Sequence, residues 1–188
     1  MRQTRFTGKV DMSKKHIMDE KDMERALTRI AHEIIEKNNG VEDIVILGIP
    51  TRGVHIARRL REILNKIEDV NLPVGAVDAT LYRDDIGMKH DQPVLKETDI
   101  PVPLDNKKVI IVDDVLFTGR TIRAAMNVIM DFGRPANIQF AVLIDRGHRE
   151  LPIRPDYVGK NAPTSIQEKV KVRLKETDGE DDVTVEIE

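Results

Sequence analysis

The chain has 188 residues, no cysteine and a formal net charge of −3. Without cysteine it has no disulfides, thiolate metal sites or cysteine nucleophiles, and we expect a reducing, cytoplasmic location. No apolar run has the pattern of a signal peptide or the length of a bilayer span, so no membrane association is expected. The mild overall acidity means that any nucleic-acid binding needs a local basic face.

The first 20 residues lack a firm pattern and are expected to form an extension, either a tail or a short leading strand. Beyond them, apolar residues at three- and four-residue spacing predict helices over 23–38, 54–67 and 121–132. Apolar runs predict strands over 43–48, 74–82, 109–112 and 138–144. This alternation predicts an α/β fold, with a mainly parallel twisted sheet flanked by helices.

Two further segments complete the expected organisation. Residues 83–106 combine proline, glycine and charge without a period, which is typical of a flexible loop that covers a binding site. Two alternating runs, 169–174 and 183–187, lie on either side of Asp178-Gly179 and predict a C-terminal β-hairpin. We therefore expect residues 21–188 to form a single domain.

The most informative segment is Val109–Thr121. A buried apolar strand is expected to end at Asp113 and Asp114, and a Thr-Gly-Arg-Thr turn then opens a helix. The amide groups of such a turn and the positive end of the helix dipole bind anions. Paired carboxylates beside a phosphate site suit a sugar phosphate with vicinal hydroxyls, such as ribose 5-phosphate.

A second candidate anion loop is Gly48–Gly53, which ends one strand and starts a helix. Its Arg52 can make charge-assisted hydrogen bonds, and Gly53 permits close approach of backbone. Both loops follow strands of a parallel sheet, where ligands bind beyond the carboxyl ends. Together they suit a sugar that carries phosphate at both ends.

Three different roles for the acid pair are less well supported. A P-loop nucleotide-binding site needs Lys and Ser/Thr after the second glycine, but Val54 and His55 follow Gly53. A receiver domain requires acids on other strand ends in a different order. A purely structural pair is costly, because two adjacent carboxylates at a strand end need partners.

The segment Val109–Thr121 resembles the phosphoribosyl-pyrophosphate (PRPP) signature of type I phosphoribosyltransferases. The resemblance implies that Asp113 and Asp114 hold the ribose hydroxyls. It implies a substrate-binding stretch through Val115, Leu116 and Phe117, with the 5-phosphate on Thr118, Gly119, Arg120 and Thr121. It also implies that Mg²⁺ is held mainly by PRPP, without a dedicated protein cage.

The same resemblance makes Thr51, Arg52 and Gly53 the diphosphate loop, with a non-proline cis peptide expected at Thr51–Arg52. Residues 83–106 then correspond to the loop that closes over the substrate and excludes water. Arg52 and Arg83 are expected to stabilise the charge of the departing diphosphate.

Phe117 bears on the choice of base. Purine-specific enzymes of this fold carry an Asp three residues after the second acid, where this chain has Phe117. A 6-oxopurine is therefore disfavoured, and uracil, whose ring NH is more acidic, is the expected base.

A second resemblance covers nearly the whole chain, except for residues 1–15. Three blocks, 26–33, 80–85 and 145–154, resemble the PyrR family, bifunctional regulators of pyrimidine operons with uracil phosphoribosyltransferase activity. This resemblance implies a small hood built from residues 145–188 and assembly as a homodimer or higher homo-oligomer. It also implies an RNA-binding surface formed by Thr28, His32, Lys37, His148, Arg149, Arg154 and Lys160.

The residues of that surface are also compatible with roles that involve no RNA. The polar side of helix 23–38 is typical of a solvated helix face, and part of the 145–160 cluster can belong to the hood. Aromatic residues make up only 3% of the chain, which favours phosphate contacts and loop shape over base stacking.

We accordingly expect transfer of phosphoribosyl from PRPP to uracil, giving UMP and diphosphate. We also expect transcription attenuation through binding of pyr operon mRNA that depends on UMP or UTP. The alternatives are a uracil salvage enzyme without an RNA role, and a regulator whose enzyme activity is vestigial.

Overall fold

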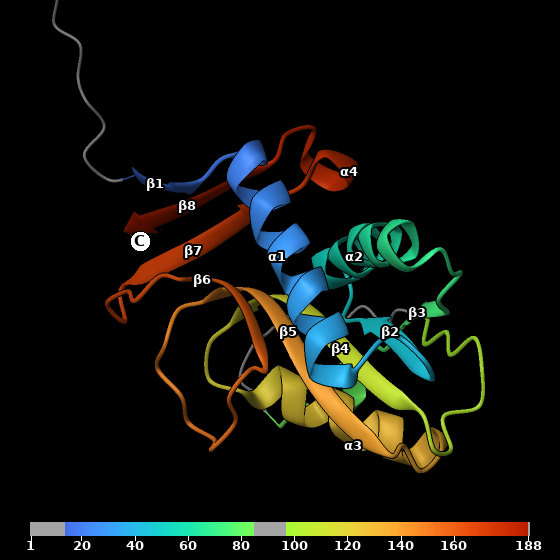
Figure 1. The fold of residues 1–188 in the computed structure, drawn as a ribbon. Helices are drawn as coiled ribbons and strands as arrows, with labels where there is room; N and C mark the ends of the chain where they lie inside the picture. Colours follow the sequence, from blue (N-terminus) through green and yellow to red (C-terminus); the bar gives the residue numbers. More distant parts are fainter. Residues whose placement is uncertain (1–13, 85–96, 188) are drawn as a thin grey trace, which may run out of the picture.

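The computed structural model describes residues 14–84 and 97–187. Its centre is a five-stranded parallel sheet in the order β3-β2-β4-β5-β6, shown in Figure 1. The strands are β2 (Ile44–Gly48), β3 (Val74–Ala76), β4 (Lys108–Leu116), β5 (Asn137–Asp145) and β6 (Tyr157–Asn161). The predicted α/β fold with a parallel sheet is confirmed.

Helices cover both faces of this sheet (Figure 1). One face packs against α1 (Glu20–Asn38) and α2 (Arg52–Glu68), and the other against α3 (Arg120–Phe132). Because successive side chains of a strand point to opposite faces, Ile110 and Val112 join the first core while Val109 and Ile111 join the second. The run of β-branched residues therefore marks a strand that is buried on both sides.

A second sheet of three antiparallel strands forms the hood, beside the upper end of α1 in Figure 1. Its order is β1-β8-β7, from β1 (Lys14–Met18), β7 (Glu168–Arg173) and β8 (Asp182–Ile187). The predicted C-terminal hairpin is present, joined by the short helix α4 (Lys175–Asp178). The later part of the expected N-terminal extension is thus a leading strand in the hood, and residues 1–13 lie outside the described part.

Two predicted strand ends were wrong, one because of a distant contact and one because of a local side-chain bond. The strand at the acid pair does not end at Val112, because pairing with β5 carries β4 on to Leu116. The strand from Val74 stops at Ala76, because the Asp78 side chain accepts bonds from Thr80 and turns the chain into a 3₁₀ helix, η1 (Thr80–Tyr82).

Strand β6 was not predicted. Its residues carry little period-2 apolar pattern, and its position depends on β5. The Asp156 carboxylate accepts from the Phe140 amide at 2.8 Å, and the buried Tyr157 hydroxyl donates to Gln139 at 2.5 Å. A Cβ on Gly159 would lie 2.5 Å from the Leu143 carbonyl oxygen, so only glycine allows this close pairing.

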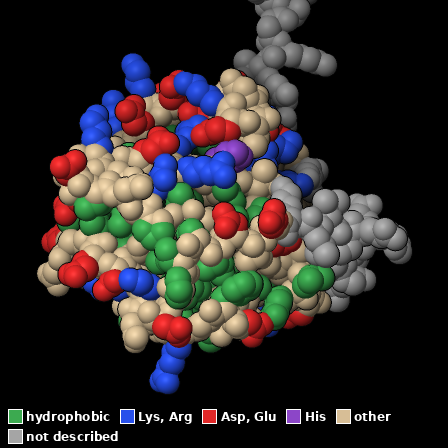
Figure 2. All heavy atoms as spheres, turned by 90° about the vertical axis from the view of Figure 1, so that its right-hand side faces the viewer, with side chains coloured by type: hydrophobic (Ala, Val, Ile, Leu, Met, Phe, Trp, Pro, Cys, Tyr) green, Lys and Arg blue, Asp and Glu red, His purple; other side chains and the backbone are tan. Residues whose placement is uncertain are grey.

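Apolar side chains also reach the surface. Figure 2 shows hydrophobic side chains gathered on the lower half of one face, at the height of α3, below a more charged region. Among the described residues, Leu81 of η1 and Met130 and Phe132 of α3 are more than half exposed. Grouped apolar exposure of this kind is typical of a contact surface. No helix within the described ranges is long and apolar enough to cross a membrane.

Candidate active site

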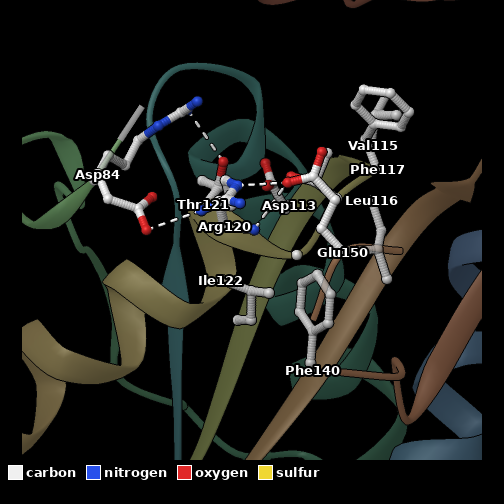
Figure 3. Close-up of a pocket in the computed structure, with 13 residues that line it drawn as sticks. Asp84, Asp113, Val115, Leu116, Phe117, Arg120, Thr121, Ile122, Phe140 and Glu150 are labelled. Carbon is white, nitrogen blue, oxygen red and sulfur yellow. Dashed lines mark hydrogen bonds and ion pairs between the residues drawn. The ribbon is translucent and has the colours of Figure 1, made fainter. Parts of the chain in front are cut away.

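A cavity of about 600 Å³ opens at the carboxyl end of β4. Its lining comes from the end of β4, the turn into α3, the segment after η1, and the loop after β5 (Figure 3). The lining residues are Arg83, Asp84, Asp113, Val115, Leu116, Phe117, Thr118, Gly119, Arg120, Thr121, Ile122, Phe140 and Glu150. The structure therefore brings most of the predicted substrate-binding residues into one cavity.

The two acids of the motif differ in their surroundings. Asp113 is buried and lines the cavity, whereas Asp114 is partly exposed and does not line it. Burial, and after it the charge of Asp114, raises the pKa of Asp113 well above its usual value, while the Asp114 amide donates to Asp113 Oδ1 at 2.9 Å. Asp113 is thus the carboxyl of the pair that is harder to ionise.

The predicted phosphate turn begins a helix, as expected. Gly119 adopts φ 93°, which places it in the left-handed region, and α3 starts at Arg120. In Figure 3, Arg120 bridges two carboxylates across the cavity mouth: Nη1 to Asp84 at 2.8 Å and Nε to Glu150 at 2.6 Å. Arg83 donates from Nη1 to the Thr121 hydroxyl at 3.1 Å. An incoming phosphate would therefore find cations, a helix N-terminus and hydroxyls at one point.

The predicted diphosphate loop lies beside the acid pair but outside the cavity lining. A Cβ on Gly53 would lie 2.5 Å from the Val112 carbonyl oxygen and 3.2 Å from the Asp113 Cα, so α2 begins directly against β4. Arg52 points to the hood, where its Nη2 donates to Asp178 Oδ1 at 2.8 Å. Bonds from Thr177 and the Leu174 amide, and then Arg52, lower the pKa of Asp178 to about 2.

The cis peptide was predicted one residue too late. It joins Pro50 to Thr51 rather than Thr51 to Arg52. Thr51 already has helical backbone angles and α2 begins at Arg52, so the chain changes direction before Thr51.

The predicted substrate loop is described only at its ends. Residues 85–96 lie outside the described part, while Arg83 and Asp84 line the cavity. From residue 97 the chain runs beside β3, where Asp99 pairs with Ala76.

The residues of the predicted RNA surface form two groups. The first lies where α1 packs beside β6, and Arg29 joins the two by donating to the carbonyls of Val158 and Gly159 at 3.0 and 2.6 Å. It contains Thr28, His32 and Lys37 of α1 with Lys160 of β6, while Arg154 precedes β6 and lines a hollow with Arg149 and Asn161. His32, Lys37, Arg154 and Lys160 are exposed, although Lys37 also pairs with Asp156.

The second group turns toward the cavity. Arg149 is only 22% exposed and donates to the carbonyl of Phe117 at 3.0 Å. His148 packs edge-on against the Phe117 ring at 5.9 Å. Arg146, which was not predicted as a site residue, places its guanidinium 4.0 Å from the centre of the same ring. In the sequence, only the position of Arg146 within the basic block 145–154 indicated a functional role for it.

Comparisons with known proteins agree with this geometry. The model of the phosphoribosyl transferase domain matches residues 13–177. A "Bifunctional protein PyrR" of Halalkalibacterium halodurans is 60% identical over 172 residues, covering 90% of this chain and 96% of that protein. The protein of the same name from Clostridium novyi is 61% identical over 169 residues, covering 90% and 95%. This chain belongs to the PyrR family.

Solved structures show the same fold. The hypoxanthine phosphoribosyltransferase of Trypanosoma cruzi matches with a TM-score of 0.70, 20% identity, and coverage of 93% of this chain and 97% of that one. A Staphylococcus aureus hypoxanthine phosphoribosyltransferase gives 0.68 at 19% identity, covering 94% and 93%. The expected type I phosphoribosyltransferase fold is confirmed, as is the resemblance to PyrR.

Proposed function

We propose that this PyrR-family protein transfers phosphoribosyl from PRPP to uracil, and that it controls pyrimidine genes by uridine-nucleotide-dependent binding of their mRNA. The observation that carries the enzymatic part is the single cavity shared by Asp113 and the Thr118–Thr121 turn. Its volume of about 600 Å³ lies in the usual range for sites that enclose a small ligand.

In this proposal the ribose lies over the end of β4. Asp113 at the cavity wall and Asp114 next to it in the chain each accept a hydrogen bond from a ribose hydroxyl. The 5-phosphate binds the turn from Thr118 to Thr121, where Arg120 exchanges Asp84 and Glu150 for phosphate oxygens.

The diphosphate then lies toward Thr51, Arg52 and Gly53. Arg52 reaches it by leaving Asp178, and Arg83 supplies a second positive charge. Within the described ranges, no three His, Asp or Glu side chains are grouped so that they could hold a metal ion. Mg²⁺ fits as an ion carried by diphosphate oxygens and water, where it would neutralise the charge of the leaving group.

The reaction needs no covalent enzyme intermediate. N1 of uracil attacks C1 of the ribose, the bond from C1 to the diphosphate oxygen breaks with its electron pair on diphosphate, and the N1 proton passes to the departing diphosphate or to water. The protein aligns the reactants and stabilises the developing charge. Phe117 lines the cavity at the position where purine-specific enzymes of this fold carry an Asp. The absence of a carboxylate at this position favours uracil as the base.

The regulatory part rests on the exposed basic residues beside β6. His32 of α1, Lys160 of β6 and Arg154, three residues before β6, are exposed, and their phosphate contacts would attract RNA. UMP or UTP in the cavity would favour the RNA-binding form, so that pyr operon transcription is attenuated when pyrimidines are abundant. We further propose a cytoplasmic homodimer or higher homo-oligomer, to which the exposed apolar side chains of α3 contribute.

Two measurements test the proposal. Asp114→Asn should lower kcat/KM for PRPP by about 100-fold, because a ribose contact is lost, while Asp69→Asn, a matched change at an exposed carboxyl after α2, should leave it unchanged. A gel shift against a pyr leader hairpin should show tighter binding with UMP. Equal affinity for leader and scrambled RNA, with activity intact, would identify a salvage enzyme instead.

A further inference from the structure

Phe117 is held from three sides by the loop that follows β5. Arg149 donates to its carbonyl at 3.0 Å, and Arg146 lies 4.0 Å from its ring centre. The His148 ring meets it edge-on at 5.9 Å. Arg146 is itself 7% exposed and fixed by bonds to Thr164 and Glu168, so this support is rigid. The loop therefore sets both the backbone and the ring of a residue that lines the nucleotide cavity.

Arg149 is not a free surface cation. Its Nε donates to the Ile153 carbonyl at 3.0 Å, and Nη1 donates to the carbonyls of Phe117 and Gly147 at 3.0 and 3.2 Å. Its Nη2 pairs with the Asp145 carboxylate at 2.5 Å. Every guanidinium nitrogen thus bonds a protein oxygen, and an RNA phosphate would have to displace one of them. Arg154, five residues on, is exposed.

The same guanidinium stands between two hollows. On one side it fixes Phe117 in the nucleotide cavity. On the other it lines, together with Arg154 and Asn161, a second hollow of about 470 Å³ beside β6. Arg149 therefore bonds a residue of the nucleotide cavity and also lines the hollow that contains the exposed basic residue Arg154.

We propose that Arg149 is a positioning residue that holds Phe117 against the base of the bound nucleotide, and that it couples the nucleotide cavity to the basic surface. The proposal rests on the proposed function. A base that packs on Phe117 stabilises one position of the Phe117 carbonyl, and hence of Arg149 and the residues 147–154 that its bonds organise. A shared element that both ligands bias is sufficient for reciprocal coupling between two sites.

The test compares Arg149→Ala with Arg154→Ala. Arg149→Ala should raise KM for uracil about tenfold with a smaller change in kcat, because base binding is lost before phosphoribosyl transfer. It should also abolish the tightening of leader RNA binding by UMP, while RNA affinity without UMP stays within about twofold. Arg154→Ala should weaken RNA binding by the same factor with and without UMP and leave KM for uracil unchanged.

Arg149→Lys separates positioning from charge. Lysine keeps the positive charge but cannot reach three carbonyls and a carboxylate at once, so it should behave like the alanine variant. Recovery of the UMP-dependent tightening in Arg149→Lys would overturn the proposal. So would an Arg149→Ala variant with unchanged KM and an equal loss of RNA affinity with and without UMP. If Arg149→Ala does not fold, an unchanged KM in Arg149→Lys overturns it. If the wild-type protein binds no leader RNA, the proposed regulatory function fails, and the KM measurement still decides the positioning role.

Discussion

The buried carboxyl of Asp113 gives the sharpest prediction about stability. Asp113 is 9% exposed, and burial followed by the charge of Asp114 raises its pKa. In Asp113→Asn the side chain keeps its volume and the oxygen that accepts from the Asp114 amide at 2.9 Å, but it cannot ionise. The substitution therefore removes the cost of a buried charge and changes little else.

The sign follows from proton binding. An unfolded Asp titrates near pH ~3.9, while folded Asp113 titrates higher, so between these values the folded protein holds one more proton than the unfolded chain. The free energy of unfolding of the wild type should then fall by up to ~1.4 kcal/mol for each pH unit in that window. Asp113→Asn lacks this loss and should become the more stable protein as pH rises through that window.

Urea unfolding between pH 4 and 8, without nucleotide, measures this difference. Far-UV circular dichroism is the suitable signal, since the chain has no tryptophan. Asp99→Asn, at an exposed carboxyl, is the control and should follow the wild type at each pH. Parallel curves for Asp113→Asn and wild type across the whole range would refute the assignment of a raised pKa.

Two more substitutions test how the sites are held. Gly53→Ala places a Cβ 2.5 Å from the Val112 oxygen, so α2 must shift; we expect a loss of about 1–3 kcal/mol in urea unfolding and a roughly 100-fold lower kcat/KM for PRPP. Wild-type values for both would contradict the close packing. Arg59→Ala removes bonds of 2.6–2.9 Å to Glu176 and Asp181 and should cost about 3 kcal/mol at pH 7. Since the Arg59 bond lowers the pKa of Glu176, the difference from wild type should shrink as pH falls below ~4, and a pH-independent difference would argue against the ion pair.

Much of the fold was predictable because its signals are local. The apolar periods of α1, α2 and α3 and the β-branched run of β4 lie within single elements, and each gave the correct element type. The candidate site was predictable for a related reason. Asp113, Phe117 and Thr121 are neighbours in one short segment, so a strand followed by a turn already brings them to the same end of the sheet.

What the sequence by itself determined is thus the parallel α/β architecture, the sugar-phosphate motif and the family. The tertiary structure alone decided how far β4 extends, where β6 pairs, and which partners the arginines take. Arg52 bonds Asp178, 126 residues away, and Arg149 bonds the carbonyl of Phe117, 32 residues away. Long flexible side chains have several partners within reach, and only the packed fold fixes which oxygens lie close enough to accept from them.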